Sequence, residues 1–211
     1  MRRLICSSVA SIMLSVQGFN VLAEESQTAS IQELADKVRK LEERVDQLEK
    51  IVHVKKEDAQ ANTQTADRRE RVRKRFEQDR AIYSIEELRE IEKLYQIAND
   101  KWDSPEAKDS LKKLIEKYAK ANRTGCALLY LGQMSSGEER EKYLKQAIDS
   151  FSDCYYGNGV QVGAYARFYL AIYYQEIGKK NEASALFDEI RKNYPDAINH
   201  KGRPLADIMP K

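Results

Sequence analysis

Two different hydrophobic periods follow one another along the chain. From residue 31 to residue 52, apolar residues recur in alternating steps of three and four, which is the heptad spacing of a coiled coil. They are Ile31, Leu34, Val38, Leu41, Val45, Leu48 and Val52. From about residue 84 onward, apolar residues keep a helical period that turn residues interrupt repeatedly. The pattern predicts an all-α protein in which an N-terminal coiled coil precedes a series of short helices.

The heptads leave the number of strands open. β-branched residues occupy every first heptad position and leucine every fourth, which favours a parallel dimer. Arg44, Val45, Leu48 and Glu49 form the Arg-apolar-x-x-apolar-Glu pattern that is associated with three-stranded coils. Because that pattern includes a specific contact between Arg and Glu of neighbouring chains, we favour a homotrimer, with the dimer as the alternative. A lone helix folded back on its own chain would show a broader apolar stripe.

Residues 164–195 carry the signals of a helical hairpin. Two helices can cross closely only where a small residue lies at the crossing and large residues fill the space around it. Ala171 and Ala183 are suited to the crossing, and the large residues are Leu170, Tyr174 and Phe187. Residues 178–181, Gly-Lys-Lys-Asn, supply the turn, and Pro195 prevents the second helix from continuing.

This spacing of small and aromatic residues resembles the tetratricopeptide repeat (TPR). Two similar units begin near residues 125 and 88, with Gly132 at the small crossing position of the first. Ser84 with Glu87, and Ser104 with Pro105, mark two helix starts independently of the repeat pattern. The resemblance implies a short TPR-like α-solenoid of about three helical hairpins over residues 84–197, since one unit cannot bury its apolar face alone.

The remaining segments complete the predicted organisation. Residues 1–23 have the pattern of a secretory signal peptide, with Arg2, Arg3 and an apolar run too short to span a bilayer comfortably. Cleavage after Ala23 leaves a short N-terminal segment (24–30), no stable membrane span and a periplasmic or secreted protein. Residues 53–67 are predicted as a polar linker, and 198–211 as a C-terminal tail that closes the open end of the solenoid.

Residues 68–83 form a predicted basic helix. An anionic partner is one explanation of its arginines. We favour a solvated helix that lays a thin apolar stripe of Val72, Phe76 and Tyr83 on the first repeat. Without Arg2 and Arg3, the chain keeps 34 of its 36 basic residues against 34 acidic ones, so its charge gives no case for nucleic acid as a partner.

Candidate chemistry is sparse. The two histidines, His53 and His200, have no metal-ligand spacing to other residues, and there is no P-loop, GxSxG or GxGxxG motif. We therefore predict no metal, no cofactor and no enzyme activity. Cys126 and Cys154 fall near the start and the end of one hairpin, whose two ends lie side by side. After export they could form a disulfide, or they could stay buried as reduced thiols, and the sequence leaves both open.

Recognition is the function that remains. The resemblance to TPR proteins implies that partners bind along the face made by the first helix of each hairpin. The residues there are Glu92, Gln96, Leu129, Gln133, Tyr165, Phe168, Ile172 and Gln175. If Tyr165 and Phe168 are exposed, they are suited to a protein ligand. If the tail covers them, the protein is a structural oligomeric spacer.

The order of leader, coiled coil, linker and TPR stack resembles the periplasmic coiled-coil and TPR accessory proteins of the bacterial Tol-Pal envelope system. That resemblance implies a homotrimer that contacts protein partners in the cell envelope. The sequence thus predicts an exported, non-catalytic adaptor, with the structural spacer as first alternative. A thiol enzyme using Cys126 or Cys154 is the second alternative, and it requires an accessible thiol of depressed pKa.

Overall fold

The fold was determined from a computed structural model of the chain. It describes the backbone of residues 5–210 and the side chains of residues 34, 36–55, 59 and 62–210. The predicted signal peptide and residues 24–30 have no described side chains, and neither has Ile31. The described residues form helices joined by turns and loops, with two isolated β-bridges, and they divide into two units, one up to Ala61 and one from Asn62. We describe each unit by itself.

Helix α1 (Ile5–Ile82) runs through residues 53–67, so the segment predicted as a polar linker is helical, and its role as a linker stays a prediction. Residues 53–67 contain no Gly or Pro, and three Ala, two Gln and two Lys among them favour helix. A polar helix exposed on all sides and a polar linker have the same composition. The missing helix breakers were the signal for the helix.

In the first unit, the heptad residues form an exposed apolar stripe on α1. The exposed fractions of Leu34, Val38, Leu41, Val45, Leu48 and Val52 lie between 49% and 58%. About half of each large apolar side chain is therefore open to solvent in the single chain. The stripe has the helical spacing that the sequence predicted, and nothing within the described unit covers it.

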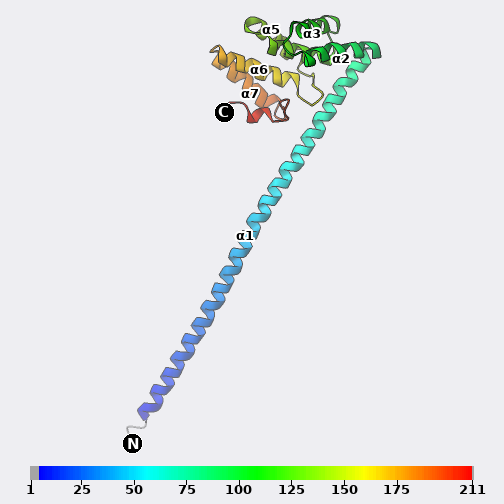
Figure 1. Cartoon of the computed structure of the whole chain (residues 1–211). Helices are drawn as coiled ribbons and strands as arrows, with labels where there is room; N and C mark the ends of the chain where they lie inside the picture. The colour runs from blue at the N-terminus through cyan, green and yellow to red at the C-terminus, as the bar shows by residue number, and fades with distance from the viewer. Residues whose placement is uncertain (1–4, 211) are drawn as a thin grey trace. The chain divides into compact units, whose positions relative to one another are not determined.

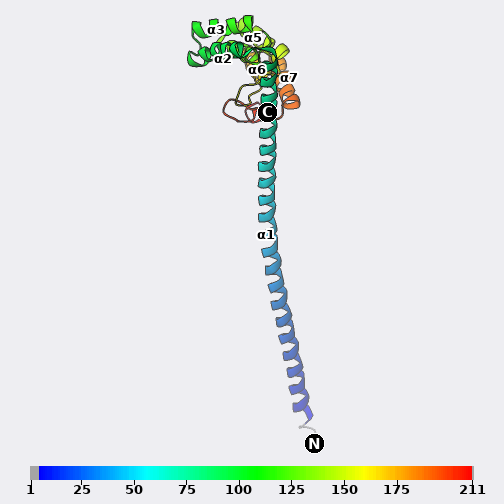
Figure 2. The same cartoon turned by 90° about the vertical axis from the view of Figure 1, so that its right-hand side faces the viewer.

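The second unit contains three consecutive antiparallel helix pairs. They are α2 (Ile85–Asp100) with α3 (Pro105–Lys117), α4 (Asn122–Met134) with α5 (Gly137–Phe151), and α6 (Val162–Glu176) with α7 (Lys180–Asn193). Each pair also packs on the next, which is how helical repeats bury a continuous core (Figure 1). Figure 2 shows the same helices gathered beside the C-terminal end of α1. The predicted hairpins are confirmed.

Side chains cap the first two of these helices. The Ser84 side chain accepts a hydrogen bond from the Glu87 N–H while the Glu87 carboxylate accepts one from the Ser84 N–H, which is a complete capping box. Ser104 caps α3, and Pro105 occupies its first turn. Both predicted helix starts are confirmed.

Close approach of the helices depends on small residues at the crossings. A Cβ atom on Gly132 would lie 2.6 Å from Leu144 Cδ2, and one on Gly125 would lie 2.8 Å from Phe151 Cβ. In the last hairpin, Ala171 and Ala183 are almost fully buried at the predicted crossing. Side chains larger than these would push the helices apart.

The C-terminal tail packs against the last hairpin. Leu205, in the short 3₁₀ helix η1 (Leu205–Asp207), is fully buried, and Met209 is nearly so. An isolated bridge between Ile198 and Pro204 closes a turn over residues 199–203. Helix α7 therefore has its outer side covered by the tail, as the sequence suggested for the end of the solenoid.

Residues 62–82 of α1 belong to the second unit and pack on the rest of it largely through arginines. The sequence did not predict this role of the arginines. Arg68 donates to the Asp196 carbonyl oxygen at 2.8 Å, and Arg71 forms an ion pair with the Asp196 carboxylate. Arg75 is almost entirely buried. One contact of the expected apolar stripe also exists, since Tyr83 packs edge-on against Tyr118 with ring centroids 5.6 Å apart. Three arginines of this segment, Arg68, Arg71 and Arg75, therefore form a packing surface.

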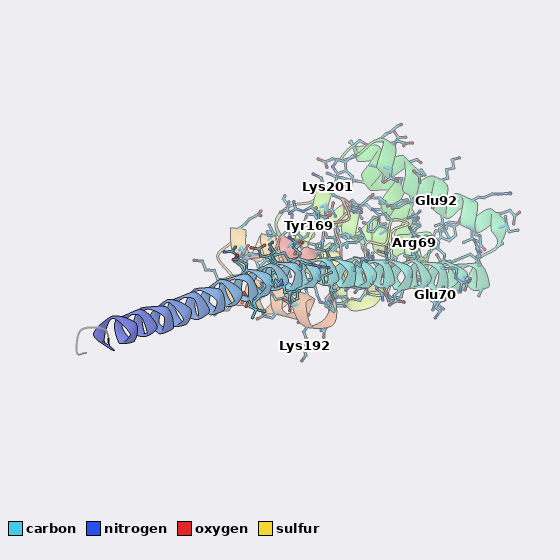
Figure 3. The ribbon with its side chains drawn as sticks, turned by 90° about the horizontal axis from the view of Figure 1, so that it is seen from below. Arg69, Glu70, Glu92, Tyr169, Lys192 and Lys201 are labelled. Atoms are coloured by element: carbon cyan, nitrogen blue, oxygen red, sulfur yellow. The ribbon has the colours of Figure 1, made fainter. Side chains whose placement is uncertain are left out.

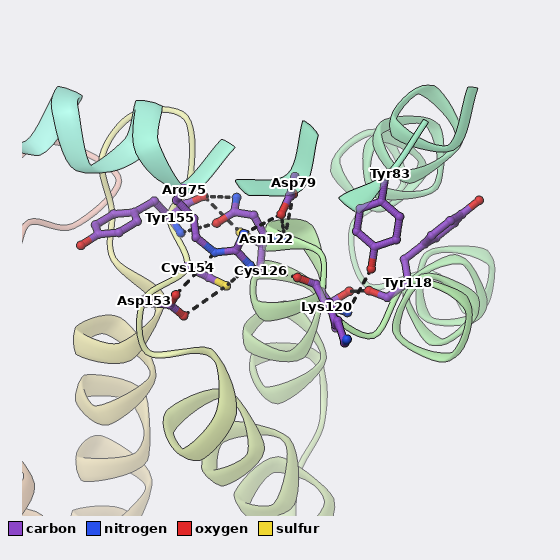
Figure 4. A network of polar contacts seen from close by, with 11 residues as sticks. Arg75, Asp79, Tyr83, Tyr118, Lys120, Asn122, Cys126, Asp153, Cys154 and Tyr155 are labelled. Carbon is purple, nitrogen blue, oxygen red and sulfur yellow. Dashed lines mark hydrogen bonds and ion pairs between the residues drawn. The ribbon is translucent and has the colours of Figure 1, made fainter. Parts of the chain in front are cut away.

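Arg75 lies at the centre of a buried polar network (Figure 4). Its guanidinium contacts the Asp79 carboxylate at 2.5 Å, the Lys120 carbonyl oxygen at 3.0 Å and Cys154 Sγ at 3.5 Å. Asp79 in turn accepts the Asn122 N–H with both oxygens, at 3.1 and 2.9 Å. Helix α4 has no side-chain cap of its own, so a carboxylate from α1 caps its positive end.

Asn122 carries the network onward to the loop between α5 and α6. Its side chain donates to the Tyr155 carbonyl oxygen and accepts the Tyr155 N–H, both at 2.7 Å. Burial raises the pKa of Asp79, while the Asn122 N–H and Arg75 oppose that shift. The network joins α1, α4 and the α5–α6 loop through one set of buried groups.

We predict that Asp79→Ala lowers the free energy of unfolding by about 3 kcal/mol, because the buried Arg75 guanidinium loses its buried carboxylate and keeps only the exposed Asp153, at 3.7 Å. Glu77→Ala is the matched control on the same helix, since Glu77 meets Arg73 only at the exposed surface, at 3.6 Å. It should cost less than about 1 kcal/mol. Urea unfolding followed by circular dichroism measures both changes. Equal effects of the two substitutions would contradict the role assigned to Asp79.

We also predict that Gly132→Ala destabilises the protein by about 1–3 kcal/mol, because the added methyl group overlaps the fully buried Leu144. Gly157→Ala is the control, since a Cβ atom there would meet nothing within 4 Å. The thermal unfolding midpoints of the two variants make the comparison. An unchanged midpoint for Gly132→Ala would mean that α4 and α5 do not cross at this residue.

Candidate partner-binding face

Helices α2, α4 and α6 lie side by side and form what we call the A-helix face. Each is the first helix of its hairpin, so the face repeats one helix position three times. The central helix, α4, is buried on nearly all sides, because α2, α3, α5 and α6 all contact it. The open surface of the face therefore comes mainly from α2, from the exposed side chains of α6 and from the ends of α4.

A continuous row of aromatic rings crosses this face. Tyr95 stacks on Tyr130 with centroids 5.4 Å apart, and Tyr130 contacts Tyr156 at 5.6 Å. His200, from the turn of the tail, then bridges Tyr156 and Tyr165 at 4.6 and 5.2 Å. Rings at these separations contribute beyond their buried area. The row holds α2, α4, the α5–α6 loop and α6 in a fixed arrangement.

Polar side chains accompany the aromatic row along α2. Tyr130 donates its hydroxyl to Asn99 Oδ1 at 2.8 Å, and the Asn99 amide donates to Gln96 Oε1 at 3.1 Å. The Gln96 amide then donates to Glu92 at 2.6 Å. Gln96 and Asn99 remain exposed, so their amides are positioned by neighbours and still open to a partner.

Arg123, at the start of α4, ties this polar row to α1. Its guanidinium forms a two-pronged contact with Glu92 at 2.9 and 3.1 Å and lies 4.1 Å from the Tyr95 ring centroid. It also faces the Phe76 ring at 5.5 Å. Although the charge of Glu92 is compensated, its side chain remains partly exposed.

The structure divides the residues that the sequence assigned to partner binding. Gln96 and Gln175 are exposed, and Glu92, Gln133, Phe168 and Ile172 are partly exposed. Leu129 is fully buried in the core, so no partner can contact it. Gln133 has its Nε2 atom buried without a hydrogen-bond partner among the described residues, so that donor does not reach the surface.

Tyr165 is only 8% exposed and contacts His200 of the tail, so of the two outcomes that the sequence left open for this residue, the covered one is found. Phe168 stacks on Tyr165 and contacts Phe187 edge-on, yet stays partly exposed. The tail thus covers one end of the face. The α2 end remains open.

Trp102 was missed as a surface residue. The sequence analysis did not assign it to the face, but its ring lies edge-on to Tyr130 at 5.0 Å and is 50% exposed. It follows α2 directly and precedes Asp103, whose φ of 59° turns the chain sharply. The sequence offered one sign of this exposure, namely the position of an amphipathic aromatic residue in a turn between two helices.

The two cysteines offer no accessible nucleophile. Both thiols are free and fully buried, with Cys126 Sγ 3.6 Å from the Tyr155 carbonyl oxygen. Burial raises the pKa of each thiol to about 12. A catalytic cysteine needs access and a lowered pKa, and these thiols have neither. The possible disulfide between Cys126 and Cys154 stays a prediction.

Within the described part of the chain, no three His, Cys, Asp or Glu residues are grouped so that they could hold a metal ion. No described helix has both the length and the apolar character needed to cross a bilayer. What the geometry provides is a stack of helical repeats with an aromatic and amide-bearing face.

The class of protein that this architecture defines is a helical-repeat protein with a TPR-like α-solenoid. Comparison with known families agrees for one hairpin: residues 165–197, which include α6 and α7, match the family described as tetratricopeptide repeat. No curated protein and no solved structure matches the chain. TPR repeats generally mediate contacts between proteins, so the last hairpin and the fold support a role in protein–protein interaction.

We predict that neither Cys126 nor Cys154 reacts with a thiol reagent at pH 7.5 in the folded protein, because burial keeps both protonated. The test uses Cys6→Ser, so that only these two cysteines remain. Denaturation in guanidinium without reductant should release two reactive thiols. No reactive thiol before reduction would instead demonstrate the disulfide that the sequence allows.

Proposed function

We propose that this protein is an exported, non-catalytic adaptor whose coiled coil joins several copies and whose TPR-like repeats bind protein partners in the cell envelope. The repeat stack and the open α2 end of the A-helix face, with Gln96, Asn99 and Trp102 exposed, support the binding role. The pattern of residues 1–23 supports export to the periplasm or the exterior. The resemblance of the segment order to Tol-Pal accessory proteins supports the envelope as the place of action.

The observation that carries the proposal is the apolar stripe on α1. Six large apolar side chains repeat at heptad spacing, and each is about half exposed in the single chain. Full burial of one such side chain stabilises a protein by about 1.5–3 kcal/mol, so leaving all of them in water is unfavourable. An isolated helix gains little from them, whereas parallel copies bury the whole stripe.

Three copies fit the sequence best. Arg44 and Glu49 flank the stripe at Val45 and Leu48, and both are exposed and available to a neighbouring chain. The β-branched first heptad positions support the dimer as alternative. Either state presents several repeat stacks at once, so weak contacts to partners gain avidity without any new contact surface.

The second candidate function is a structural oligomeric spacer. One observation favours it, namely the contact of His200 with Tyr165, which places the chain's own tail over one end of the A-helix face. The open α2 end, with Gln96, Asn99 and Trp102, favours the adaptor. A pull-down from envelope extract separates the two, because an adaptor retains specific proteins that Trp102→Ala releases.

We predict that Leu41→Asp together with Leu48→Asp converts the mature protein from a trimer to a monomer, because two charges per chain then enter the apolar seam. Lys50→Asp adds an acid of the same kind on the opposite side of α1 and should keep the trimeric mass. Light scattering coupled to size exclusion measures both. Deletion of residues 24–60 should also give a monomer. If the deletion variant still has the mass of several chains, oligomerisation through α1 is refuted.

A further inference from the structure

A second surface feature lies outside the A-helix face. Residues 65–73 of α1, the α5–α6 loop and the turn of the tail enclose a groove of about 560 Å³. Its lining residues are Thr65, Arg68, Arg69, Val72, Arg73, Gly157, Asn158, Gly159, Ile198 and Gly202. All belong to the second unit. We call this the arginine groove.

Every charged residue that lines the arginine groove is cationic. Arg68 is held by the Asp196 carbonyl oxygen and the Thr65 hydroxyl. Arg73 pairs with Glu70 at 2.8 and 3.0 Å, but both side chains are largely exposed, so the pair is weak and exchangeable. Arg69 is exposed and forms no ion pair with any described residue.

Figure 3 places Arg69 and Glu70 on opposite sides of α1, with Arg69 on the side of Lys201 and Tyr169. In this view Arg69 therefore lies on the same side of α1 as the labelled residues of the tail turn and of α6, and the Glu70 carboxylate bonds to Arg73. The opposite wall adds hydrogen-bond donors, since the N–H groups of Gly157 and Asn158 bond to nothing in the described chain.

The groove also has an apolar component. Val72 from α1 and Ile198 from the tail lie among the arginines, and Gly159, at a φ of 90°, brings the loop backbone against Arg68. A surface for a bare inorganic anion does not need such apolar residues. A mixture of guanidinium, free N–H groups and aliphatic carbon suits a short polypeptide segment that carries carboxylates.

We propose that the arginine groove binds an extended acidic segment of a partner protein whose two carboxylates are two residues apart. Arg69 and Arg73 are separated by four residues of helix, or about 6 Å along its axis. Residues i and i+2 of an extended chain point to the same side about 6.6 Å apart, so each carboxylate can meet one guanidinium. The proposal rests on the adaptor role and defines the chemistry of one partner.

Nucleic acid fits the surface less well. Glu70 and Glu77 lie beside Arg73 and Lys74 on the exposed side of α1, so the cations do not form the uninterrupted track that a phosphate backbone needs. The groove is short, whereas a chain of phosphates would extend past it to these carboxylates.

The test measures fluorescence anisotropy of labelled pentapeptides with the mature, oligomeric protein. The probe peptide is polyalanine with glutamate at its second and fourth positions and both ends capped. Arg69→Gln should weaken its binding about tenfold, because a charge-assisted contact is lost. Glu70→Gln should strengthen binding about threefold, because it frees Arg73 from its competing carboxylate.

Lys74→Gln is the matched control, since it removes one positive charge from α1 outside the groove and should change binding less than twofold. A peptide with adjacent glutamates should bind more weakly than the probe. The proposal is overturned if Arg69→Gln and Lys74→Gln weaken binding equally, or if an uncharged pentapeptide with a free C-terminus or a thymidine oligonucleotide binds better than the probe. The mass of Arg69→Gln in solution tests oligomerisation separately.

Discussion

The second unit depends on one buried ion pair between Arg75 and Asp79. Its net contribution to stability is small, because both charges lose their hydration, but each group satisfies backbone atoms that have no other partner. Asp79 completes the start of α4, and Arg75 holds the carbonyl group of Lys120 just before it. The pair therefore fixes where the second hairpin begins relative to the end of α1. Asn122 then extends that constraint to the α5–α6 loop.

Local periodicity was sufficient to predict the hairpins, since each depends on contacts only a few residues apart along the chain. The same reasoning could not predict which faces are open. Leu129 was expected on the surface, yet α4 is surrounded by four helices, and a helix in that position buries residues all around its axis. Tyr165 was covered by His200, 35 positions further along, and no local pattern signals a contact of that range.

The arginines of residues 68–75 show a related limit. As a sequence they suggest either a solvated face or an anionic partner, because the density of charge does not show which way each side chain points. In the structure, Arg68, Arg71 and Arg75 bond to carbonyl and carboxylate groups of the second unit, whereas Arg69 is exposed. Their spacing of three and four residues was the available signal. It marks one side of a helix for charged residues as well as for apolar ones.

The cap that α1 supplies to α4 has a consequence for what counts as an autonomous domain. Repeat boundaries drawn from sequence begin at Ser84, yet the peptide that starts there lacks both Arg75 and Asp79. It would leave the Lys120 carbonyl oxygen and the Asn122 backbone N–H without their partners. The smallest self-sufficient piece of the repeat region must therefore reach back into the preceding helix. In this protein, residues 75 and 79 of α1 are part of the folded repeat region, although they precede the first repeat in the sequence.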